Sequence, residues 1–179
     1  MSRRQRIPDW LTASRVLIAL AILALIPSGP EALGVVAGLL LLGWTTDMMD
    51  GRLARRYEKG PSWLGEHDFQ IDMIMVLASA IFLTTTGLVP AEVGVPYICG
   101  AVLISLYVLR YRHFLKFKSV TMLLAFPWVF MPFVIALVRA PIAAYAGLAW
   151  MTLALFFDWR RFLGVVGDFL SGARAYFRR

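Results

Sequence analysis

Four aspartates stand inside or beside long apolar stretches of the chain: Asp47, Asp50, Asp68 and Asp72. A carboxylate is unfavourable in apolar surroundings, so ionisable residues at such places are candidates for a functional site. The hydrophobic pattern predicts two helices, over residues 32–56 and 65–86, and each carries two of the four acids. Because a helix turns by about 100° per residue, residues three or four apart share a face. Each helix therefore presents a pair of carboxylates on one face.

Bringing the two faces together would place four carboxylates in one pocket, where they would repel one another strongly in a low dielectric. Divalent cations relieve this repulsion, and oxygen-only ligand sets suit magnesium, calcium or manganese. Gly51 and Ala54 share the face of Asp47 and Asp50, so a large ligand could approach the backbone there. Arg55 follows at the helix end as a partner for phosphate oxygens. The stretch therefore predicts a metal site beside a surface for a phosphorylated ligand.

This arrangement resembles the signature of the CDP-alcohol phosphotransferase family, whose members are also called CDP-alcohol phosphatidyltransferases. The family pattern is D-x-x-D-G-x-x-A-R, a spacer, and then G-x-x-x-D-x-x-x-D, and it falls on residues 47–72. The matching residues are Asp47, Asp50, Gly51, Ala54, Arg55, Asp68 and Asp72. The first glycine of the second half departs from the pattern, because Leu64 stands there and the glycine follows at Gly65. Both positions flank the acid face of the expected helix, so a small residue is still offered there.

Residues 8–15 are similar to the opening of family members, which reads P-N-x-L-T-x-x-R and ends here in Arg15; Asp9 stands where the family has asparagine. A simpler interpretation is the start of an interfacial helix, with Trp10 as an aromatic anchor. A cleavable signal peptide is disfavoured. Its small-residue cleavage site is poor, and the apolar run ends in a turn of proline and glycine at residues 27–30.

The composition of the 179-residue chain is that of an integral membrane protein. Hydrophobic residues make up 60% of the chain, charged residues only 16%, and the mean hydropathy is +0.71. Several apolar runs approach the ~20 residues that a helix needs to cross a bilayer. We expect an all-α membrane protein with short loops in a single domain, residues 1–179. Six transmembrane helices are expected near residues 16–26, 32–56, 65–86, 97–109, 120–138 and 141–157.

The basic residues follow the positive-inside rule if both ends of a six-span chain are cytoplasmic. In that arrangement all but one of the 18 Lys and Arg residues, Arg139, lie on the cytoplasmic side, and so does the aspartate motif. The tail, residues 158–179, predicts an amphipathic helix on the membrane surface. The net charge of +7 is explained by anionic lipid head groups and phosphorylated substrates, without a nucleic-acid partner. The single Cys99 excludes an intrachain disulfide.

The resemblance implies a membrane enzyme that moves a substituted phosphate group, usually phosphatidyl, from a CDP-linked lipid such as CDP-diacylglycerol to a small alcohol. CMP is released. It implies Mg²⁺ or Mn²⁺, with two ions expected, and the metal ligands would be Asp47, Asp50, Asp68 and Asp72. Asp72 is also the expected catalytic base, because the last family aspartate is the usual candidate. The nucleotide would be held by Gly51, Ala54, Arg55 and Gly65. A homodimer in the cell or inner membrane is expected.

Basic residues after the fourth expected span are candidates for binding the acceptor or its phosphate: Arg110, Arg112, Lys116 and Lys118. Many family members carry K-x-K-[T/S] just before the fifth span, and residues 116–119 match it; the simpler interpretation is ordinary cytoplasmic charge. Chain length and this cluster favour glycerol 3-phosphate as acceptor, as in phosphatidylglycerolphosphate synthases. The Arg-Glu pair expected in the fourth span of those enzymes is missing, so inositol phosphate, serine and another lipid stay open.

Two functions from other classes are alternatives to a CDP-alcohol transferase. Intramembrane prenyltransferases also use two aspartate-rich motifs with magnesium, but they are longer and lack the D-G-x-x-A-R run. A cation transporter or channel would place its acids near the middle of the membrane, whereas these acids lie beside a basic cytoplasmic mouth. The sequence therefore favours a membrane transferase over both.

Both termini are predicted to be cytoplasmic, because nearly all basic residues then lie on the cytoplasmic side. Cysteines introduced at Ser2 and at Ser28 should be labelled from opposite sides of the membrane. Labelling of both positions from the same side would overturn the six-span arrangement.

Overall fold

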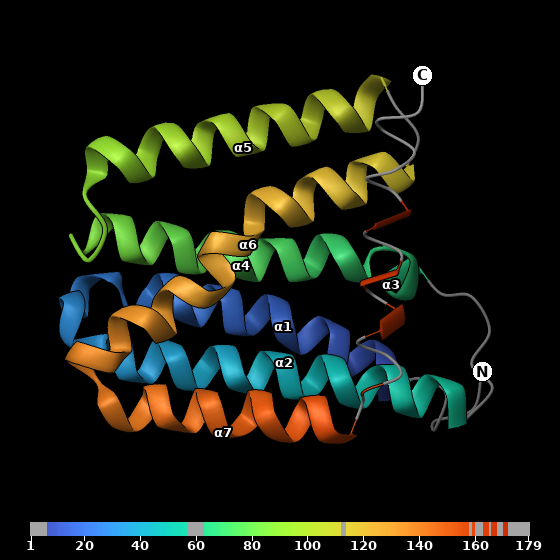
Figure 1. Cartoon of the computed structure of the whole chain (residues 1–179), viewed down its shortest axis with the longest axis horizontal. Helices are drawn as coiled ribbons and strands as arrows, with labels where there is room; N and C mark the ends of the chain where they lie inside the picture. The colour runs from blue at the N-terminus through green and yellow to red at the C-terminus, as the bar shows by residue number, and fades with distance from the viewer. Residues whose placement is uncertain are drawn as a thin grey trace.

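The computed structural model of the chain describes residues 7–56, 63–111 and 114–157, with a few positions of the tail (159, 163, 164, 166, 167, 170 and 171). Every regular element in these residues is helical, which confirms the expected all-α fold. The long helices are α1 (Ile7–Ala24), α2 (Leu33–Arg56), α4 (Asp68–Thr85), α5 (Ala91–Tyr111), α6 (Phe114–Arg139) and α7 (Pro141–Phe157). All of them but α6 run along the long axis of the molecule, and α6 crosses the bundle obliquely (Figure 1). Two short elements are η2 (Ile26–Ala32) and α3 (Trp63–Glu66).

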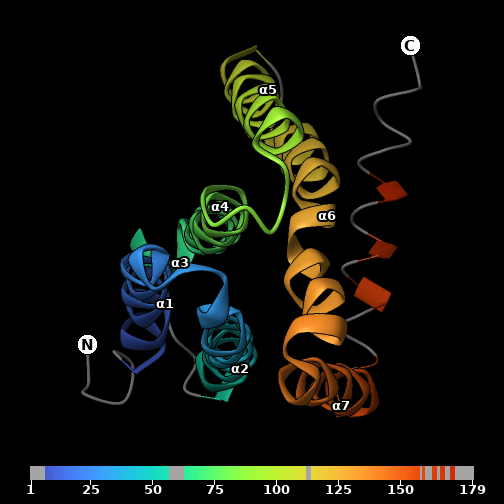
Figure 2. The same cartoon turned by 90° about the vertical axis from the view of Figure 1, so that its left-hand side faces the viewer.

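Three of the helices form the part of the bundle that carries the aspartates. α1 packs against both α2 and α4, and Figure 2 shows the three grouped together. α6 contacts α2 and α4 from the other side, and it also contacts α5 and α7. Pro127 and Pro132 lie inside α6, where each removes a backbone hydrogen bond, and they account for the bend of this helix in Figure 1.

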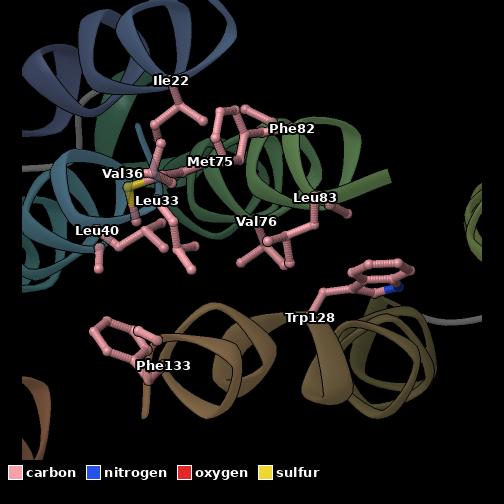
Figure 3. Close-up of a cluster of buried hydrophobic side chains, with 14 of the residues drawn as sticks. Ile22, Leu33, Val36, Leu40, Met75, Val76, Phe82, Leu83, Trp128 and Phe133 are labelled. Carbon is pink, nitrogen blue, oxygen red and sulfur yellow. The ribbon is translucent and has the colours of Figure 1, made fainter. Parts of the chain in front are cut away.

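The apolar core lies where α1, α2, α4 and α6 meet (Figure 3). Gly43 of α2 is buried against α4 at this place, since a Cβ on Gly43 would lie only 2.3 Å from Met75 Sδ. The absence of a side chain at Gly43 leaves room for the end of the Met75 side chain against α2. Gly43 stands one turn before Asp47 and Met75 follows Asp72 by three residues, so this contact joins the two helices close to the two acid pairs.

Among the described residues, four helical stretches are long and apolar enough to cross a membrane. They are Ile26–Leu53, Asp68–Thr85, Ala91–Arg110 and Phe117–Arg139. α7 is also apolar but has only 17 residues. The chain is therefore an integral membrane protein, whereas six spans stay a prediction. Most of the tail, and with it the predicted amphipathic helix, lies outside the described residues.

Two expected boundaries differ from the structure. The helix expected over residues 65–86 is divided at His67, whose ring stacks on Trp63 and whose Nδ1 lies 2.8 Å from the Trp63 carbonyl oxygen. Gly65 therefore lies on α3, not on the helix of Asp68 and Asp72. Residues 91–96, expected as a loop, are the first part of α5. Pro96 is the sixth residue of α5 and removes one interior backbone hydrogen bond, but the helix still begins before it, with an acid, Glu92, that favours the first turn.

Replacing Gly43 with valine should displace the end of the Met75 side chain, because the added atoms would meet Met75 Sδ and Cε, and this core side chain is only 1% exposed. Overpacking of a core costs about 1–3 kcal/mol. Because the flexible end of a methionine can move aside, we expect the low end of this range and a fall of about 2–4 °C in the melting temperature in detergent. Gly38→Val is the matched control, since a Cβ on Gly38 of the same helix meets nothing within 4 Å. Equal melting temperatures for the two variants would contradict the packing of Met75 against Gly43.

Candidate active site

The two halves of the aspartate motif meet at one end of the bundle. Asp47 and Asp50 lie one turn apart towards the end of α2, and Asp68 and Asp72 lie one turn apart at the start of α4. The end of α2 and the start of α4 are at the same end of the molecule (Figure 1). Carboxylate oxygens of Asp47, Asp50 and Asp68 all lie within 4.8 Å of one another. The structure thus joins both acid pairs in one cluster.

A fifth charged residue, Arg15 of α1, lies at the centre of this cluster. Its side chain is fully buried, and it forms ion pairs with all four aspartates. Nη1 contacts Asp72 Oδ1 and, at 3.2 Å, Asp47 Oδ1. Nη2 contacts Asp50 Oδ2 and Asp68 Oδ1. One guanidinium therefore joins α1, α2 and α4.

Thr12, one turn before Arg15 on α1, adds to these contacts. Its buried hydroxyl accepts a hydrogen bond from Arg15 Nη2 at 3.2 Å and donates one to Asp50 Oδ2 at 3.0 Å. The side chain of Asp50 is only 7% exposed, whereas those of the other three aspartates are between 27% and 35% exposed. Asp50 and Arg15 therefore form the floor of the site, and the other three carboxylates are within reach of a ligand from outside.

The charges in this cluster do not balance. In their ionised forms the four carboxylates carry four negative charges around one guanidinium, so the five side chains together have a net charge of −3. Clustered carboxylate oxygens with excess negative charge suit hard divalent cations such as Mg²⁺. The residues present therefore fit a divalent cation, and Asp47, Asp50 and Asp68 lie close enough together to share one.

Arg15 and Thr12 are not among the site residues expected from the sequence. The sequence feature that could have indicated them is the P-x-x-L-T-x-x-R segment, in which Arg15 directly precedes an apolar run. A charged side chain at such a place requires an opposite charge. Which acids provide it cannot be read from spacing, because Arg15 and its partners are between 32 and 57 residues apart.

The residues expected to hold a nucleotide are described in part. Gly51 is half-buried and follows Asp50 on α2, and Gly65 is exposed on α3. The side chains of Ala54 and Arg55 lie outside the described part of the structure, although both residues belong to α2. The structure therefore places a residue without a side chain directly beside the acid cluster at Gly51.

The basic residues expected to bind the acceptor are also described in part. Lys118 lies on α6, with Nζ 5.8 Å from the centre of the Phe69 ring, a cation–π contact beside Asp68. Arg110 is exposed in the last turn of α5. Arg112 and the side chain of Lys116 lie outside the described residues. α5 ends and α6 begins at the end of the bundle that carries the aspartates, so Arg110 and Lys118 are on the same side as the site (Figure 1).

An apolar cavity of about 290 Å³ lies between α4, α5 and α6. It is lined by Gln70 and Phe117 near the level of the aspartates and by Ala80 and Trp128 farther along the bundle, ~15 Å away at 1.5 Å per helical residue. Gln70 Oε1 and Trp128 Nε1 are buried without a hydrogen-bond partner in the described part of the chain. The cavity reaches the level of Asp72 along the bundle but lies on the other face of α4, because its lining residues Gln70 and Met73 are turned by about 100–160° from Asp72 around the helix.

A sequence model of the CDP-alcohol phosphatidyltransferase family matches residues 5–159 of the chain. This range contains the four aspartates, Arg15 and all the long helices of the described bundle. Comparisons with curated proteins and with solved structures gave no match. The family consists of transferases that move a phosphatidyl group from a CDP-alcohol to an acceptor, generally with a divalent metal. The match covers well over half of the chain, which therefore belongs to the CDP-alcohol phosphatidyltransferase family.

Proposed function

We propose that this protein transfers a phosphatidyl group from a CDP-linked lipid such as CDP-diacylglycerol to a small alcohol and releases CMP. The observation that carries the proposal is the convergence of four carboxylates from α2 and α4 at one end of a helical membrane bundle. A donor diphosphate is itself negative, so its binding beside these carboxylates requires divalent cations between them. Family membership gives the reaction class.

The metal would be Mg²⁺ or Mn²⁺, and two ions are proposed. They would be held by Asp47, Asp50, Asp68 and Asp72. When bound, the metal would neutralise the diphosphate and stabilise the CMP leaving group. The chain's own part is to hold the carboxylates close together. It does so through the packing of Gly43 against Met75 and through the hydrogen bond from Thr12 to Asp50.

Asp72 is the proposed general base. Its carboxylate is 29% exposed, so an acceptor hydroxyl can reach it. The hydroxyl would give its proton to Asp72 while its oxygen forms a bond to the β-phosphorus of the donor. The bond from this phosphorus to the bridging oxygen breaks, CMP leaves with that oxygen, and Asp72 then returns the proton to water. The protein would contribute mainly by holding the reacting oxygen in line with the leaving group.

The nucleotide is proposed to lie along α2 and α3, in contact with Gly51, Ala54, Arg55 and Gly65. Gly51 supports this placement because it is half-buried directly beside Asp50 and adds no side chain between the ligand and the backbone. The guanidinium of Arg55 would pair with phosphate oxygens of the donor.

The apolar cavity between α4, α5 and α6 supports a lipid as the donor. Its lining is almost entirely apolar, and its near end lies at the level of Asp72 along the bundle, on the other face of α4. A hydrocarbon chain of the donor that passes around the end of α4 can leave water in this space while the diphosphate lies at the carboxylates.

Glycerol 3-phosphate is the proposed acceptor, which would make the protein similar to phosphatidylglycerolphosphate synthases. Arg110 and Lys118 support a phosphorylated acceptor, since both lie at the end of the bundle that holds the carboxylates. Arg112 and Lys116 are proposed to share this role. The alternative acceptors are inositol phosphate, serine and another lipid, with the same chemistry. A prenyltransferase or a cation transporter gains no support from the family match.

The protein is proposed to act in the cell or inner membrane, as one domain with six spans and as a homodimer. Cytoplasmic termini and a cytoplasmic active site are supported by the charge distribution, because all but one of the 18 Lys and Arg residues then lie inside. A soluble phosphorylated acceptor would reach the site from that side.

An acceptor screen tests this proposal. Protein purified in detergent receives CDP-diacylglycerol, Mg²⁺ or Mn²⁺ and one acceptor at a time, and the release of CMP is followed. We expect release with glycerol 3-phosphate and none in the presence of a metal chelator. Release with a different acceptor would replace glycerol 3-phosphate but keep the reaction. No release with any acceptor would contradict the proposed function.

Two asparagine variants should separate metal binding from proton transfer. Asp50→Asn removes a metal ligand, so metal-dependent CDP affinity and turnover should both fall. Asp72→Asn keeps the shape of the side chain but cannot accept a proton. Its turnover should collapse while its CDP affinity stays within about tenfold of the parent, a difference of ~1.4 kcal/mol. CDP affinity is measured by calorimetry, and turnover by CMP release.

Glu92→Gln is the control for these two variants, because Glu92 is an exposed acid in the first turn of α5, at the opposite end of the bundle. It should leave both quantities unchanged. Equal loss of CDP binding in Asp50→Asn and Asp72→Asn would show that Asp72 is only a metal ligand. Retained turnover in Asp72→Asn would remove it from the reaction.

A further inference from the structure

Arg15 takes no part in the reaction as proposed, although it makes more ion pairs than any other described residue. It is also among the largest side chains that the structure fully buries. We propose that Arg15 is a positioning residue that serves as an internal counter-cation. It holds the four carboxylates together in the metal-free protein, and divalent cations displace it when they bind. This inference rests on the metal-binding role of the aspartates in the proposed function.

The contacts of Arg15 explain how the carboxylates stay clustered without metal. Four carboxylates brought together in a membrane bundle repel one another, and a buried guanidinium is equally unfavourable without acidic partners. In the structure the guanidinium supplies positive charge to the carboxylates and the carboxylates supply acceptors to the guanidinium, because the two terminal nitrogens of Arg15 reach all four aspartates. Thr12 fixes the guanidinium and Asp50 relative to each other through two hydrogen bonds.

The same contacts place Arg15 in competition with a metal ion. Asp47, Asp50 and Asp68 are the acids whose oxygens lie close enough to share one ion, and each of them already gives an oxygen to the guanidinium. A divalent cation would need these carboxylates, and its charge would repel a guanidinium at contact distance. Metal and Arg15 therefore cannot both make their best contacts with the cluster.

The hydrogen bonding of Arg15 is incomplete, which favours its release. Nε is buried and has no partner in the described part of the chain, so the guanidinium is held only through its two terminal nitrogens. A buried donor without an acceptor lowers the stability of the arrangement that contains it. Part of the attraction between Arg15 and the carboxylates is offset in this way.

Competition has a measurable consequence for the metal. The apparent affinity for the cation is its intrinsic affinity reduced by the work of displacing Arg15, so removing the arginine should tighten metal binding. A residue that only supports the fold would not have this effect, because its loss would weaken metal binding or leave it unchanged.

The test compares the parent with Arg15→Met, a side chain that keeps apolar bulk and loses the charge. Both proteins are purified in detergent with Mg²⁺, and melting temperatures are then recorded from excess chelator to saturating Mg²⁺. Binding of Mn²⁺ to the chelator-treated, dialysed proteins is measured by calorimetry. Arg139→Met is the matched control, because Arg139 is exposed at the end of α6, at the opposite end of the bundle from the aspartates.

In chelator, Arg15→Met should melt about 10 °C below the parent, because four carboxylates then lie together without a cation. This difference should shrink to a few degrees at saturating Mg²⁺, since the metal supplies the missing charge. The Mg²⁺ midpoint and the Mn²⁺ dissociation constant should both fall by about tenfold relative to the parent. Arg139→Met should match the parent in all three measurements.

The outcomes that contradict the inference differ from those that contradict the proposed function. If Arg15→Met loses the same stability at every metal concentration and binds Mn²⁺ no more tightly than the parent, Arg15 is only structural and the inference is wrong. If neither metal stabilises or binds the parent, the metal site of the proposed function is wrong as well.

Arg15→Lys is the second variant, for the case in which Arg15→Met does not fold even with Mg²⁺. Lysine keeps one positive charge but lacks the two terminal nitrogens that reach four carboxylates at once. Its melting temperature in chelator should lie below that of the parent, and its Mn²⁺ affinity should be several-fold tighter. An Mn²⁺ affinity equal to that of the parent, or weaker, would overturn the competition between Arg15 and metal.

Discussion

The guanidinium of Arg15 and the four carboxylates around it are the contact on which the first three long helices depend. Apolar packing gives little preference between helices in a lipid environment, where small residues and polar contacts decide which faces meet. In the middle of the bundle the small residue is Gly43 of α2, which leaves room for the Met75 side chain of α4. At the end that carries the motif, the polar contact is that of Arg15, which connects α1 to both acid pairs. Side-chain packing and ion pairs therefore connect these helices at two different positions along the bundle.

The acid pairs could be predicted from the sequence because their geometry is local. Residues three and four apart share a helix face wherever the helix lies, and the chain indeed folds into helices around Asp47 and Asp72. Arg15 could not be assigned in this way, since its partners are at least 32 residues away and helix packing alone decides which of them it meets. The apolar cavity beside α4 could not be predicted from the sequence either, because it forms between three helices rather than within one.

Local side-chain contacts explain where the helix boundaries differ from expectation. The prediction of a continuous helix through residue 65 does not take into account the contacts of His67 with Trp63, which accompany a break before Asp68. Pro96 indicates a loop when it is read alone, but it is the sixth residue of α5, which tolerates the loss of one backbone hydrogen bond. In both places hydropathy identified the helix correctly, and the larger difference from the prediction is at its first residue. The second of these boundaries lies at the opposite end of the bundle from the site.

The opposite directions of α2 and α4 place Asp50 and Asp68 in different electrostatic surroundings. A helix carries partial positive charge at its first turn and partial negative charge at its last, and this macrodipole acts over about one turn. Asp68 is the first residue of α4, so backbone N–H groups stabilise its negative charge without help from any cation. Asp50 has no such support, because it lies within α2 on the side of that helix's negative end, and it is also the most enclosed of the four. The carboxylate of Asp50 therefore depends on neighbouring positive charge more than that of Asp68 does, whichever cation provides it.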